Sequence, residues 1–296
     1  MPDNIYISTN AFKTKDLTQI LDICLENRFY NLELGSNVDY SEDILPLIRR
    51  YNRNPMNFLI HNYFPPHKEV FVLNLCSNDS DILARTVEHC QSAIDLTAEF
   101  DGRFYSVHAG YAFNVKLSDL GKPVKKTEIM PYQEAYEIFL KKITILNEYA
   151  RKKGVGLLIE NHEVSPCNLT EGENALLLLP ASQDLLKFYR DIDSDNLGFL
   201  VDLGHLKVTS TTLDFDPYEF VSDLSQHIRI FHLNDNNGYK DEHLKFNEYS
   251  WFKDIIYKFN DRIFVIESQG LEIEEIKECQ SYLLNMLNGA YVERQG

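Results

Sequence analysis

Short runs of apolar and β-branched residues recur along the chain, and longer segments with helical spacing separate them. Runs rich in Val, Ile, Phe, Tyr and Leu are typical of buried strands. Between the first two runs, Leu17, Ile20, Leu21 and Cys24 recur at three- and four-residue intervals, which predicts an amphipathic helix. Further helices are predicted within residues 81–99, 136–146 and 276–287. The predicted strands are residues 5–8, 30–34, 58–61, 104–108, 156–160, 197–202, 228–232 and 263–267.

The order of these elements predicts the fold class. A strand followed by a helical segment, repeated eight times, indicates parallel strands joined by crossover helices. Eight such units favour a closed barrel over an open, doubly wound sheet. No linker rich in Pro, Gly or Ser divides the 296 residues. We therefore expect an α/β protein with a single (β/α)8 TIM barrel of parallel strands, in which residues 1–296 form one domain.

Cysteine content and the lack of targeting signals bear on the compartment. The five cysteines are scattered and include no CxxC pair, which suits a reducing environment. The first residues lack the layout of a signal peptide, and no run approaches the roughly 18 apolar residues of a membrane span. We expect a cytoplasmic protein with no membrane partner. The sequence leaves a homo-oligomer open.

The formal net charge of −16 affects the choice of partner. It repels nucleic-acid phosphates on average, so a nucleic-acid partner is disfavoured but not excluded. One local basic group stands against this average, and we interpret it first as a solvated face and second as a phosphate-binding site. Its members are Lys116, Lys122, Lys125 and Lys126.

Ionisable side chains follow six consecutive predicted strands. Parallel strands direct their carboxyl ends to the same rim of a barrel, and alternation then decides which side chains face the interior. If these groups face inwards, they converge on one cavity. The residues are His61 in FLIHN, His108 in YSVHAG, Glu160 in LLIENH, Asp202 and His205 in FLVDLGH, His232 in RIFHLND, Asp241 and His243 in KDEH, and Glu267 in FVIES.

Carboxylates and imidazoles that are buried together need a compensating cation. Each residue alone has an ordinary structural role, for example Asp202 as a helix cap or Asp241 and His243 as solvated loop residues. Their coincidence at six strand ends instead favours a site for a divalent metal. A mixed His, Asp and Glu set without thiolates suits Mn, Zn, Co or Mg.

The residues around these strand ends have weaker interpretations. Residues 234–238 read NDNNG and are interpreted as a turn, with Asp235 as a further partner that orients His232. Four aromatic residues follow the histidines of the third and fourth strands, and we expect packing ahead of stacking on a sugar or a base. They are Tyr63, Phe64, Tyr111 and Phe113.

The segments LLIENH, FLVDLGH, FHLND…GYKDEH and FVIES resemble the xylose-isomerase-like barrel superfamily, which contains sugar isomerases, sugar epimerases and apurinic endonucleases. The resemblance extends from the first strand to Glu267. By similarity to the ketose epimerases, it implies one metal held by Glu160, Asp202, His232 and Glu267. It also implies that Glu160 and Glu267 act as the acid/base pair, with His61, His108 and His205 near the substrate.

Two enzymatic hypotheses follow from this resemblance. The first is a divalent-metal-dependent sugar or sugar-phosphate isomerase or epimerase, in which two glutamates transfer protons through an enediolate and the partner is a small carbohydrate. The second is a metal-dependent phosphodiesterase of the apurinic endonuclease type with up to three zinc ions. In that branch the further ligands would be His61, His108, His205, Asp241 and His243. A barrel that binds a small molecule without catalysis is the third and least favoured hypothesis.

Overall fold

A closed barrel of eight parallel strands forms the centre of the protein, as a computed structural model of residues 3–52, 55–114 and 128–293 shows. The strands are hydrogen-bonded in chain order, and β8 closes the barrel against β1. The predicted (β/α)8 barrel is therefore confirmed. The strands are β1 (Ile5–Ser8), β2 (Asn31–Leu34), β3 (Asn57–His61), β4 (Phe104–His108), β5 (Gly156–Glu160), β6 (Leu197–Asp202), β7 (Ile228–Leu233) and β8 (Ile263–Ile266).

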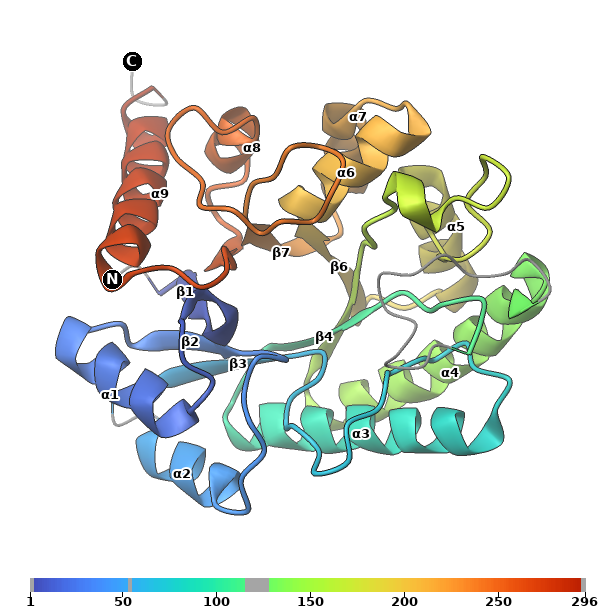
Figure 1. The fold of residues 1–296 in the computed structure, drawn as a ribbon, viewed down its shortest axis with the longest axis horizontal. Helices are drawn as coiled ribbons and strands as arrows, with labels where there is room; N and C mark the ends of the chain where they lie inside the picture. Colours follow the sequence, from blue (N-terminus) through green and yellow to red (C-terminus); the bar gives the residue numbers. More distant parts are fainter. Residues whose placement is uncertain (1–2, 53–54, 115–127, 294–296) are drawn as a thin grey trace.

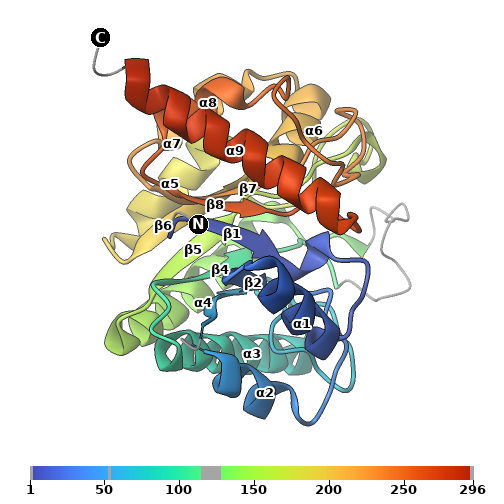
Figure 2. The same cartoon turned by 90° about the vertical axis from the view of Figure 1, so that its left-hand side faces the viewer.

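Helices surround these strands as an outer layer (Figure 1). The last of them, α9, lies across β8 and beside α8 (Figure 2). Two consecutive helices, α6 and α7, connect β6 to β7. The helices are α1 (Leu17–Asn27), α2 (Ile44–Tyr51), α3 (Ser80–Glu99), α4 (Tyr132–Lys153), α5 (Ser182–Ile192), α6 (Leu203–Leu213), α7 (Pro217–Leu224), α8 (Lys253–Lys258) and α9 (Ile273–Glu293).

The first helix illustrates why these segments fold as they do. The Asp16 side chain accepts hydrogen bonds from the backbone N–H groups of Thr18 and Gln19, which satisfies donors at the start of α1. The apolar positions that predicted this helix, among them Ile20 and Cys24, are buried against the barrel. The helix ends at Asn27, and the next residue, Arg28, adopts a left-handed conformation.

A separate layer of apolar side chains fills the inside of the barrel. Because side chains alternate along a strand, the residues two positions further along each strand also face the interior. In five strands that residue is an ionisable one. The inner layer consists of Leu59, Leu158, Leu200, Ile230 and Val265, and the residues two positions later are His61, Glu160, Asp202, His232 and Glu267.

A register shift between β6 and β7 determines which residues of these two strands are paired. Phe199 pairs with Ile228, but the next residue, Leu200, pairs with Ile230, so β7 contains one extra residue at this point. As a result Asp202 is paired directly with His232. In the neighbouring strands, β4 and β5 pair His108 with Glu160 without such a shift.

Two expectations concern regions beyond the barrel. Among the helices in the described ranges, none combines the length and the apolar character that a bilayer span requires. The basic group of Lys116, Lys122, Lys125 and Lys126 lies outside the described residues.

Truncating the inner layer should cost stability because the barrel interior cannot collapse around a missing side chain. Leu200 is completely buried, and we expect Leu200→Ala to lower the free energy of unfolding by about 2–5 kcal/mol. The control is Ile145→Ala on α4, because Ile145 is 45% exposed and should lose much less. Chemical denaturation of both variants measures the difference. Equal losses would show that the inner layer is not the core described above.

Candidate metal centre

Five ionisable side chains lie directly above the apolar layer, at the C-terminal ends of their strands. All five are almost completely buried, the most exposed at 4%. The cavity above them has a volume of about 530 Å³, and His108, His205, Asp241 and His243 also line it. The strand ends therefore meet at one cavity, as the sequence predicted.

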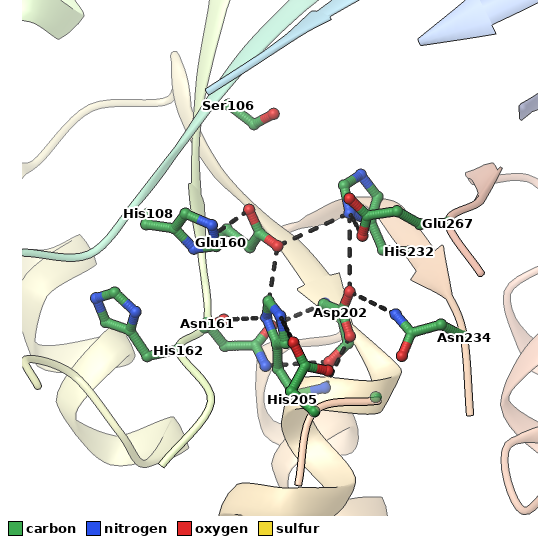
Figure 3. Close-up of polar contacts among 12 residues, drawn as sticks. Ser106, His108, Glu160, Asn161, His162, Asp202, His205, His232, Asn234 and Glu267 are labelled. Atoms are coloured by element: carbon green, nitrogen blue, oxygen red, sulfur yellow. Dashed lines mark hydrogen bonds and ion pairs between the residues drawn. The ribbon is translucent and has the colours of Figure 1, made fainter. Parts of the chain in front are cut away.

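The central group consists of Glu160, Asp202, His232 and Glu267, whose ligand atoms all lie within 4.8 Å of one another. His232 Nδ1 is 2.7 Å from Glu267 Oε2, 3.7 Å from Glu160 Oε1 and 3.9 Å from Asp202 Oδ2. Figure 3 shows the three carboxylates arranged around this imidazole nitrogen. Four strands thus supply one donor each to a common point.

A second group shares Glu160 with the first. His61 Nε2 and His108 Nδ1 lie 3.3 and 3.4 Å from Glu160 Oε2. The other oxygen, Oε1, is the one that faces His232 and His205. The carboxylate of Glu160 therefore presents one oxygen to each group, which is the arrangement a ligand shared by two cations would have.

A third group lies nearer to the loop that follows β7. It consists of His205, Asp241 and His243. Asp241 Oδ2 is 3.3 Å from His205 Nε2 and 2.7 Å from His243 Nε2. Asp241 and His243 are therefore not solvated loop residues, because the loop folds back over the rim and directs them at α6.

Four of the histidines use one ring nitrogen towards the groups and bind the other to a fixed partner. Such a bond behind a ring holds its orientation and determines which nitrogen is free to bind a cation. These bonds are His61 Nδ1 to Ser106 Oγ (2.8 Å), His232 Nε2 to Glu33 Oε2 (2.9 Å), His205 Nδ1 to the Asn161 carbonyl (3.0 Å) and His243 Nδ1 to the Glu267 carbonyl (3.2 Å).

Burial changes the protonation of the carboxylates. Desolvation raises the pKa of Glu160 to about 8 and that of Asp202 to about 6, and the nearby carboxylate of Glu267 contributes to raising both. Burial lowers the pKa of His232, but the carboxylates of Glu267 and Glu33 outweigh burial and raise it well above the usual range. Protons therefore carry the compensating charge in this protein when no cation does.

The two histidines of the second group behave differently. Burial lowers the pKa of His61, and burial together with the neighbouring imidazoles of His162 and His205 lowers that of His108 well below its usual value. Both rings are therefore neutral at physiological pH. A neutral imidazole has the free lone pair that metal coordination requires.

The unsatisfied polar atoms test whether these residues fit a cation. His232 Nδ1, Glu267 Oε2, Glu160 Oε2 and His108 Nδ1 are buried and have no hydrogen-bond partner within the described residues. The first two form an ion pair 2.7 Å long that lacks the geometry of a hydrogen bond. Buried polar atoms without partners are costly, and a divalent cation bound in each of the central and second groups would satisfy them. The donor set fits a metal ion.

The comparisons with known proteins agree with this geometry. Residues 28–283 match the family model described as xylose isomerase-like TIM barrel. This protein is a xylose isomerase-like TIM barrel. It is 26% identical to protein MJ1311 of Methanocaldococcus jannaschii over 302 residues, which cover 98% of this chain and 92% of that protein.

Solved structures share the same fold at low sequence identity. A D-tagatose 3-epimerase-like protein superposes with a TM-score of 0.75 at 23% identity, covering 98% of this chain and 99% of the other. An L-ribulose 3-epimerase superposes with a TM-score of 0.67 at 16% identity, covering 98% and 96%. These similarities confirm the barrel of this xylose isomerase-like protein.

Three residues that sequence reasoning missed support the site of this xylose isomerase-like barrel. Glu33 on β2 is 1% exposed and bonds His232, and the sequence signal was a single glutamate inside an apolar strand. Asn161 accepts a bond from the Asp202 backbone N–H through its side chain. Asn234 donates to Asp202 Oδ2 at 2.9 Å. The amides therefore hold Asp202 in place.

Two interpretations of the NDNNG segment were wrong. Asn234 is not a turn residue, because it is completely buried at the end of β7 and bonded to Asp202. Asp235 does not orient His232: it forms an ion pair with Lys207 at 2.7 Å and accepts a bond from Ser250. Alternation along the chain directs Asp235 away from the interior and leaves Glu33 as the partner of His232.

A substitution at Gly204 tests the support of Asp202. A Cβ atom there would lie 1.8 Å from Asn234 Oδ1, so Gly204→Ala must displace the amide that bonds Asp202. We expect unfolding free energy to fall by about 1–3 kcal/mol and divalent-metal affinity to fall about 10–100-fold. The control is Gly35→Ala, whose added Cβ meets its nearest atoms at 3.6 Å. Metal titration of both variants measures the effect, and unchanged affinity in Gly204→Ala would contradict this account of Asn234.

Proposed function

We propose that this protein is a divalent-metal-dependent isomerase or epimerase of a sugar or sugar phosphate. The observation that carries the proposal is the central group, in which three carboxylates and one imidazole from four strands lie within 4.8 Å at the floor of a cavity. Three carboxylates so close together are stable only with protons or a cation among them. Mn, Zn, Co and Mg all suit these donors.

The named relatives support the carbohydrate class. Both structural neighbours described above carry the names of 3-epimerases of ketoses. The chain covers nearly the whole length of each, so the fold corresponds from end to end. The net charge of −16 further favours a small substrate over a nucleic acid.

The two glutamates are placed for proton transfer. A bound divalent cation would polarise a sugar carbonyl and so lower the barrier to removing the proton on the adjacent carbon. Glu160 ends β5 and Glu267 follows β8, three strands away around the barrel. One carboxylate can therefore take the proton from one face of the carbon while the other returns a proton from the opposite face or to the next carbon. His61, His108 and His205 would bind the hydroxyl groups.

Loss of one glutamate should stop proton transfer and leave the fold intact. We expect Glu267→Gln to slow exchange of a ketose C–H proton with deuterated water by about 10²–10⁴-fold, since the amide cannot accept the proton. Removing the metal with a chelator should have a similar effect. The exchange is followed by NMR on a panel of ketoses and ketose phosphates.

The matched control for this prediction is Glu274→Gln, because the Glu274 side chain is 78% exposed on α9. It should retain the activity of the unsubstituted protein. If the wild-type protein with metal catalyses no exchange on any member of the panel, the isomerase proposal fails.

Metal affinity should rise with pH because cation and protons compete for the same atoms. Below pH 8, Glu160 holds a proton that must leave before the carboxylate can bind a cation. We expect affinity to rise by at least about tenfold per pH unit between pH 6 and 8, because His232, whose pKa is also raised, must lose a proton as well. Calorimetry at pH 7 in two buffers of different ionisation enthalpy should detect proton release on binding. An affinity that is flat across this range would contradict the protonation described for the site.

A second candidate function is a phosphodiesterase with three cations. The specific observation in its favour is that the second and third groups flank the central one, with Glu160 directing one oxygen to each side. Three clustered cations would activate water and stabilise the leaving oxygen of a phosphate ester. The further ligands that this branch of the family would use all line the same cavity, where His61 and His205 are buried and the other three are half-buried.

The number of bound metal ions distinguishes the two candidates. One tightly held ion per chain favours the isomerase, and a number near three together with nicking of abasic DNA at low salt favours the phosphodiesterase. If the second group holds an ion, His108→Asn should lower the count by about one, whereas His227→Asn, at the start of β7, should leave it unchanged. Metal analysis by mass spectrometry after dialysis measures the count.

A further inference from the structure

A second cavity adjoins the one above the metal-binding residues. It has a volume of about 500 Å³ and is formed by the segments that follow β2, β3 and β4 together with α3. Ser36, Asn62, His108 and Tyr111 line both cavities, so the two are adjacent and share a wall. Each cavity alone has the size of a small-molecule site.

The two cavities differ in chemistry. The metal cavity is lined by carboxylates and imidazoles, whereas the buried wall of the second cavity is apolar and includes Leu75, Val107 and Cys90. The charged residues of this second cavity, Lys15, Asp39 and Lys68, are all exposed and therefore lie towards its mouth. An uncharged, apolar group is what its interior would accept.

Aromatic rings form one side of this cavity. Tyr63, His67 and Phe71 line it and pack edge to face, with ring centroids 5.2–5.8 Å apart. His89 stacks on Tyr63 from behind at 5.5 Å. Tyr40 lines the cavity with 43% of its surface exposed. Such ring faces and edges favour another flat ring over a flexible alkyl chain.

Hydrogen bonds hold this aromatic wall in place without a ligand. His89 Nε2 donates to the Asn62 carbonyl at 2.8 Å, because a carbonyl can only accept. Burial lowers the pKa of His89 to about 4, so its ring is neutral and Nδ1 accepts from His67 Nε2 at 2.9 Å. The Tyr63 hydroxyl accepts from the Phe71 backbone N–H at 3.1 Å. The wall is therefore formed in advance, which reduces the entropy lost on binding.

From these observations we infer that the substrate is a keto sugar that also carries an uncharged aromatic ring, as in an aryl glycoside with a ketone on its sugar ring, with the aromatic ring bound in the second cavity and the ketone at the metal-binding residues. The inference rests on the proposed function and narrows its substrate class. A free monosaccharide at the metal-binding residues would leave the apolar cavity empty.

Matched ligands test the ring. Phenyl, hexyl and methyl β-D-glucosides and the corresponding ribosides differ only in the group that would enter the second cavity. We expect the phenyl compounds to bind at least about tenfold more tightly than the methyl ones and more tightly than the hexyl ones, since burial of the ring provides most of the difference. Calorimetry measures these affinities with Mn²⁺ and again in excess chelator.

A variant that fills the second cavity provides a second test of the ring site. Val70 lines the cavity but is 58% exposed, so Val70→Trp can place an indole ring in it without disturbing the core. In this variant the roughly tenfold higher affinity for the phenyl compounds over the methyl compounds should disappear. The control is Ile145→Trp on α4, at a position of similar exposure outside both cavities, and it should keep the preference.

The outcomes separate this inference from the proposed function. A phenyl preference that persists in chelator and disappears in Val70→Trp supports the ring site, even if no proton exchange is ever detected. Equal binding of the phenyl and methyl compounds, tighter binding of the hexyl compounds, or equal behaviour of Val70→Trp and Ile145→Trp would overturn the inference, even if the isomerase activity is found.

Discussion

Alternation of side chains along parallel strands is the constraint on which the rest of this structure depends. In five strands an apolar residue that fills the barrel is followed, two positions later, by a carboxylate or an imidazole. The first set can form a dry core only if it faces inwards, and the geometry of a strand then forces the second set inwards as well. The hydrophobic effect that closes the barrel thus also brings the charged groups together.

The residues that would bind a ligand in this cavity are also the ones whose burial destabilises the fold. The carboxylates of Glu160, Asp202 and Glu267 are buried side by side, and burial alone would be costly for each. Raised pKa values at Glu160 and Asp202 and a bond from Asn10 to Glu267 show how the protein tolerates them. The remaining unsatisfied atoms are concentrated where a ligand would complete the site.

The sequence predicted the barrel and the converging residues because both follow from local patterns. The strand at residues 197–202 was placed correctly from its apolar run, and Glu160 and Asp202 were placed by alternation from Leu158 and Leu200. Every one of the nine residues expected at the site lies at the cavity or at its floor. What they bind stays a prediction.

The parts that could not be predicted depend on contacts between distant segments. The partner of His232 is Glu33, which is 199 residues away in sequence, and only closure of the barrel brings the two together. Asp235 was the nearer choice along the chain, but it faces the opposite side of its strand. The cavity beside Tyr63 is likewise formed by three loops and a helix, none of which has a distinctive pattern alone.

The extra residue in β7 has a consequence for how this barrel could change during evolution. Ile228 faces the outer core whereas Ile230 faces the interior, although an uninterrupted strand would direct both to the same side. The bulge at Arg229 thus separates the part of β7 that packs against the helices from the part that faces the cavity. Without Arg229, Ile228 and Ile230 would be consecutive, and regular alternation would still direct His232 into the cavity opposite Asp202. The bulge therefore accommodates one residue more or less in the outer half of β7 without changing the orientation of the imidazole.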